Sequence, residues 1–284
     1  MTTATLPGTA DHRRLHRPHG WALIGVVVVT FLAGGSGWFA WRWTGSRPAP
    51  VSVASALERF RTMQATAGAG GPLQPRAGVY RYTAQATEHV SLPPKTVQEG
   101  PVIPVTVTRL PGGCWQTRVD LSDSHWEGGT FCSRNGSLYQ VGRGGWMRWD
   151  FVVLVVEDTS TFRCSAEETV IPAEPRPGAS APFSCVGTND HLSTGPVTMA
   201  GTSTVVGGEQ LAVSGRQVPV LHVRENATFS GGQSGAYQAD IWFGPDGLPL
   251  RERWSTQVRT ASPVGTTTMT GGGDYRITSL TPRS

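Results

Sequence analysis

The segment with the most chemically versatile side chains is Asp-Leu-Ser-Asp-Ser-His-Trp-Glu at residues 120–127. On an extended strand, side chains alternate between the two faces, so Asp123, His125 and Glu127 point the same way. Carboxylate and imidazole groups gathered on one face can bind a metal ion. One strand supplies only three ligands, however, and the sequence identifies no others that complete a site. We therefore interpret the segment as a solvated face or turn between strands, and we expect no metal and no cofactor.

Sequence motifs of the common catalytic sites are missing. The chain contains no Gly-x-Ser-x-Gly, Ser-x-x-Lys or His-Glu-x-x-His motif, and no P-loop or dinucleotide fingerprint. His89, His191 and His222 are isolated in the sequence, which is typical of surface or hydrogen-bonded strand residues. We therefore expect a non-catalytic protein. The alternative is an enzyme whose signature is specific to its own fold.

A group of aromatic side chains is the strongest candidate for ligand contact. Trp146, Trp149 and Phe151 lie close together in the sequence. On a curved sheet they can line the concave face and bind an acyl chain or a hydrophobic peptide. We expect Trp242, on a neighbouring strand, to be a weaker member of this wall, and Phe60, on a covering helix, to face it from the other side. Ordinary core packing is the alternative for the same residues.

The four cysteines indicate the compartment. Their spacings of 18, 32 and 21 residues fit no common zinc or thioredoxin pattern. Four cysteines allow three pairings, and we favour the sequential one, because it cross-links neighbouring strands through two short loops. The expected bonds are Cys114–Cys132 and Cys164–Cys185, in a domain exposed to an oxidising exterior. Four buried free thiols in a cytoplasmic domain are the alternative.

Hydrophobic periodicity predicts one helix followed by many strands. Val53, Ala56, Leu57 and Phe60 recur at helical spacing, and we predict an amphipathic helix over 52–66. From residue 76 onward the period changes to two, as in half-buried strands. Strands are predicted to begin near residues 79, 102 and 115, and to follow at 129–133, 137–141, 146–156, 197–206, 209–213, 218–229, 236–243, 248–259 and 266–278.

Turn residues separate these strands. The predicted turns are Asn135-Gly136, Gly144-Gly145, Gly207-Gly208, Gly231-Gly232 and Asp246-Gly247. Many strands, one early helix and no βαβ alternation indicate a strongly curved antiparallel sheet. The apolar run over 151–156 favours a strand that is buried on both faces, or one that lines an apolar cavity.

The net charge of +4 arises near the N-terminus. Residues 1–50 carry five arginines against one aspartate, so residues 51–284 are neutral overall. A neutral body lacks the broad positive surface that binds nucleic acid, and we expect no nucleic-acid partner. With 36 Gly and 21 Pro among 284 residues, the composition also argues against a helical bundle.

Residues 21–41 form an uncharged run that is long enough to cross a bilayer as a helix. Tryptophans flank the run, and three arginines precede it against two that follow closely, which favours a cytoplasmic N-terminus. A cleaved signal peptide with an apolar core from Trp21 to Ala33 is the alternative. In the cell membrane we expect a cytoplasmic tail over 1–20, a transmembrane helix over 21–41, a linker over 42–50 and an extracytoplasmic β domain over 51–284.

In the C-terminal third, residues 239–254 read Ala-Asp-Ile-Trp-Phe-Gly-Pro-Asp-Gly-Leu-Pro-Leu-Arg-Glu-Arg-Trp, and the segments Thr-Thr-Thr-Met-Thr at 266–270 and Asp-Tyr-Arg-Ile-Thr-Ser-Leu-Thr-Pro at 274–282 follow. This order resembles the end of the LolA/LppX-like, lipoprotein-carrier-like superfamily. The resemblance implies a half-barrel of antiparallel strands with helices on the concave side. Several members of the superfamily carry lipids or lipoproteins across an envelope. Gly78-x-Tyr80-x-Tyr82 and Gly113-Cys114-Trp115 also resemble an uncharacterised actinobacterial family of membrane-anchored proteins.

These observations predict a mainly β protein with one N-terminal transmembrane helix, an amphipathic helix and a half-barrel of antiparallel strands. We expect the exported domain to be non-catalytic and to bind a lipid, an acyl chain or an envelope protein on its concave face. The alternative is a structural or interaction domain whose core is filled and holds no ligand.

Overall fold

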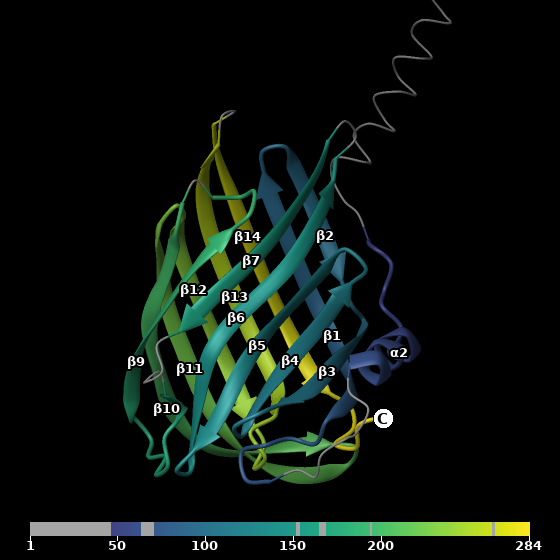
Figure 1. Ribbon diagram of the computed structural model, residues 1–284, viewed down its shortest axis with the longest axis vertical. Helices are drawn as coiled ribbons and strands as arrows, with labels where there is room; N and C mark the ends of the chain where they lie inside the picture. The colour runs from purple at the N-terminus through teal and green to yellow at the C-terminus, as the bar shows by residue number, and fades with distance from the viewer. Residues whose placement is uncertain (1–46, 64–70, 152–153, 165–168, 194, 263–264) are drawn as a thin grey trace, which may run out of the picture. The chain divides into compact units, whose positions relative to one another are not determined.

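The computed structural model describes residues 47–63, 71–151, 154–164, 169–193, 195–262 and 265–284 (Figure 1). Within these ranges, the helix α2 (Val53–Met63) precedes a 14-stranded sheet. The strands are β1 (Gly78–Ser91), β2 (Pro94–Glu99), β3 (Val102–Leu110), β4 (Cys114–Ser122), β5 (His125–Arg134), β6 (Ser137–Asp150), β7 (Val155–Cys164), β8 (Thr169–Ile171), β9 (Ser180–Asn189), β10 (Val197–Val213), β11 (Arg216–Gly231), β12 (Ser234–Phe243), β13 (Pro249–Ser262) and β14 (Gly265–Ile277).

The sheet closes on itself, so the predicted half-barrel is wrong. Strand β1 pairs with β14 from Tyr82↔Ile277 to Val90↔Met269, which joins the first strand of the domain to the last. The ring runs from β1 through β3 to β7 and on through β9 to β14, twelve antiparallel strands in all (Figure 1). Strand β2 extends β3 along the same edge of β1, and β8 pairs with β6. The protein is therefore a closed antiparallel barrel.

Side-chain alternation explains why these segments form the wall of a barrel. Along β1, each second residue from Tyr80 to Val90 is buried and points inward, while the residues between them from Arg81 onward are exposed. Closure removes the unpaired edges that an open sheet would present to other chains. Short turns connect many neighbouring strands, and Asn135-Gly136 between β5 and β6 has the two positive φ angles, 50° and 77°, of a type I′ hairpin.

Two predicted turns lie inside strands instead. Gly144 and Gly145 belong to β6, where a Cβ atom at either position would come within about 3.0 Å of a neighbouring carbonyl oxygen. Gly207 and Gly208 lie in the long strand β10, at a β-bulge that shifts the register against β11. In both places glycine serves a close approach or a bulge within the sheet.

The apolar run over 151–156 does not form one continuous strand. Strand β6 ends at Asp150 and β7 begins at Val155, and the two strands pair as a hairpin. Phe151 is buried, whereas Leu154 is 53% exposed at the end of the barrel. Phe151 and Leu154 therefore lie at the end of the β6–β7 hairpin, and Phe151 contributes an inward aromatic ring.

Helix α2 packs on the outside of the barrel. Its residues Ala56 and Phe60 contact Val79, the outward-facing residue at the start of β1. The buried carboxylate of Asp120 on β4 accepts hydrogen bonds from Arg59 of the helix at 2.5 Å and from Arg118 at 2.8 Å. The expectation that this helix covers the concave face is not met, although its predicted position in the sequence is confirmed.

One end of the barrel is filled by a close-packed apolar core. Among its largest members, each at most 1% exposed, are Tyr80, Trp115, Leu138, Phe243, Leu248 and Leu250. The tip of the β10–β11 hairpin bends to this end, where the Ser214 hydroxyl donates to the Thr278 carbonyl at 2.6 Å. Leu211 and Val213 of that hairpin join the same core. This end of the barrel is therefore closed.

Both predicted disulfides are present. Cys114 on β4 is bonded to Cys132 on β5, and Cys164 on β7 is bonded to Cys185 on β9. In each case the two cysteines are directly opposite each other on neighbouring strands. The described part of the chain has no free cysteine. Each bond therefore cross-links two neighbouring strands of the barrel wall.

Within the described ranges, we find no helix with the length and apolar character that a membrane span requires. The predicted transmembrane helix at 21–41 lies outside the described residues. The same holds for the predicted tail at 1–20 and for the first part of the linker, residues 42–46.

Candidate functional site

The candidate site is a cavity of about 560 Å³ inside the barrel, which we call the lumen. Its lining includes residues at the ends of several hairpins, among them Leu92, Pro93, Leu154, Ala261 and Thr267. These residues lie at the end of the barrel opposite the close-packed core, where β1 meets β2 and β13 meets β14 (Figure 1). The lumen therefore reaches the open end and stops at the filled one.

An apolar section lines the lumen near the open end. It consists of Val90, Met147, Trp149, Phe151, Val156 and Met269, which pack together with the buried Val97 of β2. The rings of Trp149 and Phe151 are stacked, with centroids 6.4 Å apart. Such a surface binds apolar groups through the area that it removes from water.

Below the apolar section lies a set of charged side chains, which we call the ionisable belt. The belt consists of Glu88, His125, Glu127, Arg143, Glu225 and Glu252, which line the lumen, and of Glu99, which lies beside His125. Its depth follows from the inward residues of single strands, since Glu88 lies between Tyr82 in the core and Val90 in the apolar section. Along β6, Arg143 likewise lies between Leu138 in the core and Trp149. The lumen is therefore polar in the middle and apolar towards its opening.

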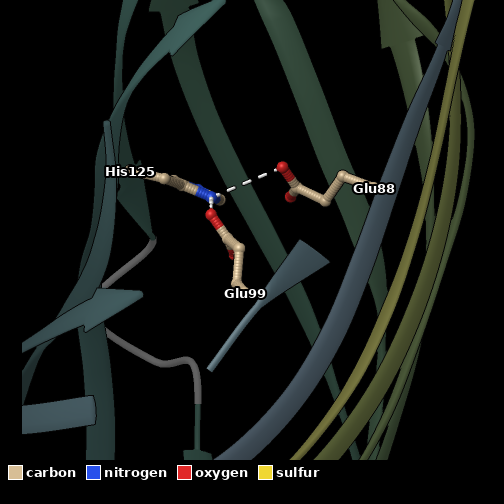
Figure 2. A group of neighbouring side chains, drawn as sticks. All are labelled: Glu88, Glu99 and His125. Atoms are coloured by element: carbon tan, nitrogen blue, oxygen red, sulfur yellow. Dashed lines mark hydrogen bonds and ion pairs between the residues drawn. The ribbon is translucent and has the colours of Figure 1, made fainter. Parts of the chain in front are cut away.

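His125 and two glutamates form one part of the belt (Figure 2). The Nδ1 atom of His125 on β5 lies 3.1 Å from Oε1 of Glu99 on β2 and 3.4 Å from Oε2 of Glu88 on β1. Burial alone would lower the pKa of His125, but the two carboxylates raise it to about 10. Burial raises the pKa of Glu88 to about 7, against the opposite effect of His125. The histidine is therefore a cation at neutral pH, held between two acids.

Glu127 and Glu252 are held by tyrosine hydroxyl groups in a second part of the belt. Tyr275 donates to Oε1 of Glu127 at 3.2 Å, and Tyr237 donates to Oε1 of Glu252 at 3.4 Å. Burial, together with the nearby glutamates, raises the pKa of Glu252 to about 8. Burial also raises the pKa of Glu127. These carboxyl groups therefore keep protons more readily than exposed ones.

Arg143 supplies the positive charge on this side of the lumen. Its guanidinium group lies 2.5 Å from Oε2 of the buried Glu225, and it also lies over the rings of Phe183 and Tyr237. A buried ion pair of this kind costs desolvation energy, and it is stable only when the partners stay together. The belt thus holds five glutamates, four of them at the lumen, against one arginine and one histidine. The raised pKa values of Glu88 and Glu252 show that these surroundings oppose further negative charge, so the belt favours neutral hydrogen-bond donors or cations over anions.

The structure places three of the five predicted ligand-contacting residues at the lumen. Trp149 and Phe151 belong to the apolar section, and both are buried. Trp146 also borders the lumen, but strand alternation puts its side chain on the other face from Trp149. There it borders a second pocket, on the outside of the barrel, together with Arg118 and Trp126.

Phe60 and Trp242 lie outside the lumen. Phe60 is buried between α2 and the outer face of β1. Trp242 stacks on His222 with ring centroids 4.4 Å apart, and its indole N–H donates to Oε2 of Glu209 at 2.9 Å. Neither residue is among those that line the lumen. The predicted set is therefore divided between the interior and the outer wall.

Sequence reasoning found only part of the ionisable belt. Two members of the predicted same-face group, His125 and Glu127, do point into the lumen, whereas Asp123 is exposed in the turn between β4 and β5. Glu88 and Glu99 were missed, although each falls on the inward phase of an alternating strand. Their position in the alternation could have identified them, because a charged residue among inward-facing apolar residues indicates a buried polar site.

Among the described residues, Glu88, Glu99 and His125 form a group whose geometry suits a metal ion. Each offers one ligand atom, and these atoms lie within 4.8 Å of one another. All three side chains are buried. The group opens to the lumen through Glu88 and His125, which both line it.

Comparisons with known proteins identify no family for this chain. No protein-family model matches the chain, and no curated protein matches it. A solved structure with some similarity is that of the hypothetical lipoprotein YmcC from Escherichia coli (K12). It is 14% identical with a TM-score of 0.33, over 72% of this chain and 85% of that chain. The resemblance to the LolA/LppX-like superfamily, and that to the actinobacterial family, stay predictions.

Proposed function

We propose that this protein is a non-catalytic binding domain that encloses a small amphipathic ligand in the lumen of its barrel. The observation that carries the proposal is the change in lining along the lumen, from the apolar section at the open end to the ionisable belt at mid-depth. A volume of about 560 Å³ falls in the usual range for small-molecule sites, roughly 300–1,000 Å³.

The lining also selects the orientation of the ligand. The apolar chain would lie against Trp149, Phe151 and Met269, and the polar end would reach the belt. Four glutamates of the belt accept hydrogen bonds, so the polar end is expected to carry a hydroxyl or amine group. A carboxylate end is disfavoured, because the burial and nearby charges that raise the pKa values of Glu88 and Glu252 would also oppose the charge of the ligand. The ligand class is therefore a single-chain alcohol or amine.

Two disulfides support an extracytoplasmic location for this activity. Disulfides between strands persist in oxidising compartments and are rare where glutathione keeps thiols reduced. We infer that the protein meets its ligand outside the cytoplasm, in or near the cell envelope.

The proposal is tested by titrating the full-length protein with N-phenyl-1-naphthylamine, an uncharged aromatic amine that fluoresces in apolar surroundings. We expect a saturable rise in fluorescence with one probe per protein. Dodecylamine and dodecanol should displace the probe, and dodecanoate should displace it at least about tenfold less well, a difference of about 1.4 kcal/mol. The physical reason is the excess of carboxyl groups at the inner end of the lumen.

The competing function, a structural or interaction domain without a ligand, gives a different result. A barrel whose lumen is filled in solution would show no saturable fluorescence, and none of the three dodecyl compounds would change the signal. Equal displacement by all three compounds would show a purely apolar site, and it would remove the belt from the proposed recognition.

A further inference from the structure

His125, Glu88 and Glu99 converge on a single point, as ligands of a metal ion do. Both carboxylates approach the same nitrogen atom, Nδ1 of His125, at 3.4 and 3.1 Å (Figure 2). Ligand bonds of 2.0–2.2 Å at tetrahedral angles place neighbouring ligand atoms about 3.4 Å apart. The observed separations between nitrogen and oxygen therefore match those around a four-coordinate dication.

A second observation at the same place is an oxygen atom without a partner. The side chain of Glu99 is fully buried, and its Oε2 accepts no hydrogen bond from the residues that the structure describes. Its Oε1 already accepts from Ser122 at 3.2 Å and lies beside His125. A buried carboxylate oxygen that lacks a donor is costly, and its presence calls for an unseen group.

From these two observations we propose that Glu88, Glu99 and His125 form a binding site for a transition-metal dication such as Zn²⁺. One imidazole and two carboxylates suit such an ion by ligand type. The ion would displace the proton from Nδ1 to solvent, and its two charges would balance the two glutamates. Glu88 and His125 line the lumen, so the ion and a fourth ligand, a water molecule, have a route to the site.

A second histidine in the barrel wall provides a natural control. His222 and His125 are each 7% exposed, and each contacts two carboxylates. At His222, however, Glu209 lies 2.8 Å from Nδ1 and Asp240 lies 2.8 Å from Nε2. The two acids are on opposite sides of the ring, where one ion cannot bind both. Each site therefore has one buried imidazole and two carboxylates, but only at His125 do both carboxylates approach the same ring nitrogen.

The test is calorimetric titration of the tag-free, full-length protein with Zn²⁺, beside the variants His125→Gln and His222→Gln. We expect the wild type to bind one ion in a site that His125→Gln weakens by more than about 100-fold, a larger loss than outer partners of a metal ligand give. His222→Gln should keep that site. Absence of binding in the wild type, or equal loss in both variants, would overturn the proposal.

X-ray absorption at the zinc edge of the wild-type complex covers the case in which His125→Gln fails to fold. The proposed site predicts one imidazole nitrogen and otherwise oxygen ligands. Coordination by several imidazoles would place the ion elsewhere, for example on His12, His16 and His19 of the N-terminal segment, and would overturn the assignment. Because this test reports on the metal alone, it stands or fails independently of the dodecyl ligands.

Discussion

Replacing Trp149 by alanine is expected to abolish most binding of N-phenyl-1-naphthylamine, whereas replacing Trp242 by alanine leaves it unchanged. Trp149 lines the lumen in the apolar section, and Trp242 lies on the outer wall against His222. Loss of the large aromatic contact should lower the affinity for the probe about tenfold or more, since each 1.4 kcal/mol of binding free energy is one factor of ten in the dissociation constant. Fluorescence titration of both variants measures the difference.

The comparison separates a binding contact from a packing contact. Both tryptophans are buried, at 4% and 8% exposure, so both variants should lose about 3–5 kcal/mol of unfolding free energy. Denaturant melts give that loss directly. If Trp149→Ala is too unstable to titrate, Phe151→Leu offers a milder change in the same section. Equal probe affinity in wild type and all lumen variants would show that these rings belong only to the core.

Substituting Glu252 by glutamine is expected to flatten the dependence of stability on pH. Burial beside Glu127 and Glu225 raises the pKa of Glu252 to about 8, above the ordinary value of 4.5. Between these two values the folded protein holds a proton that the unfolded chain releases, so stability falls as pH rises from 4.5 to 8. With about 1.4 kcal/mol for each pKa unit, the wild type should lose about 5 kcal/mol over this window of about 3.5 units.

The glutamine variant should therefore be the more stable protein at pH 9 and nearly equal to the wild type at pH 4. Its side-chain carbonyl can still accept the hydrogen bond of Tyr237. Glu157→Gln is the matched control, because that glutamate lies on the exposed side of the wall, with 52% of its side chain exposed. Parallel pH curves for wild type and Glu252→Gln, from urea melts at each pH, would contradict the assignment.

The local elements of the fold could be predicted from the sequence. The spacing of Val53, Ala56 and Phe60 predicted a helix, and period-two alternation predicted most of the strands, but not β2, β7, β8 and β9. Asn135-Gly136 predicted a hairpin that the structure confirms. These signals are short-range, and each depends on a few neighbouring residues.

Barrel closure could not be predicted, because it depends on contacts between distant parts of the chain. Pairing of Tyr82 with Ile277 is not marked by any local pattern, and an open curved sheet has the same alternation as a closed one. The side of the sheet that α2 covers was likewise undetermined. Its apolar stripe needs a partner surface, and the outer face of β1 supplies one through Val79.

The ionisable belt was only partly visible for a related reason. His125 and Glu127 stand two residues apart, so one strand brings them to one face. Glu88 and Glu99 come from β1 and β2, and they approach His125 of β5 only once the wall has formed. A site built from three strands requires the topology as well as the sequence pattern.

Photolabelling tests the central account, ligand binding inside the lumen, most directly. Dodecylamine with a diazirine at the end of its chain should be bound by the wild-type protein, activated by light and located by peptide mass spectrometry. The account predicts adducts in the apolar section, at Met147, Trp149, Phe151 and Met269. Adducts confined to the outer wall around α2 or Trp242, or no saturable labelling, would contradict it.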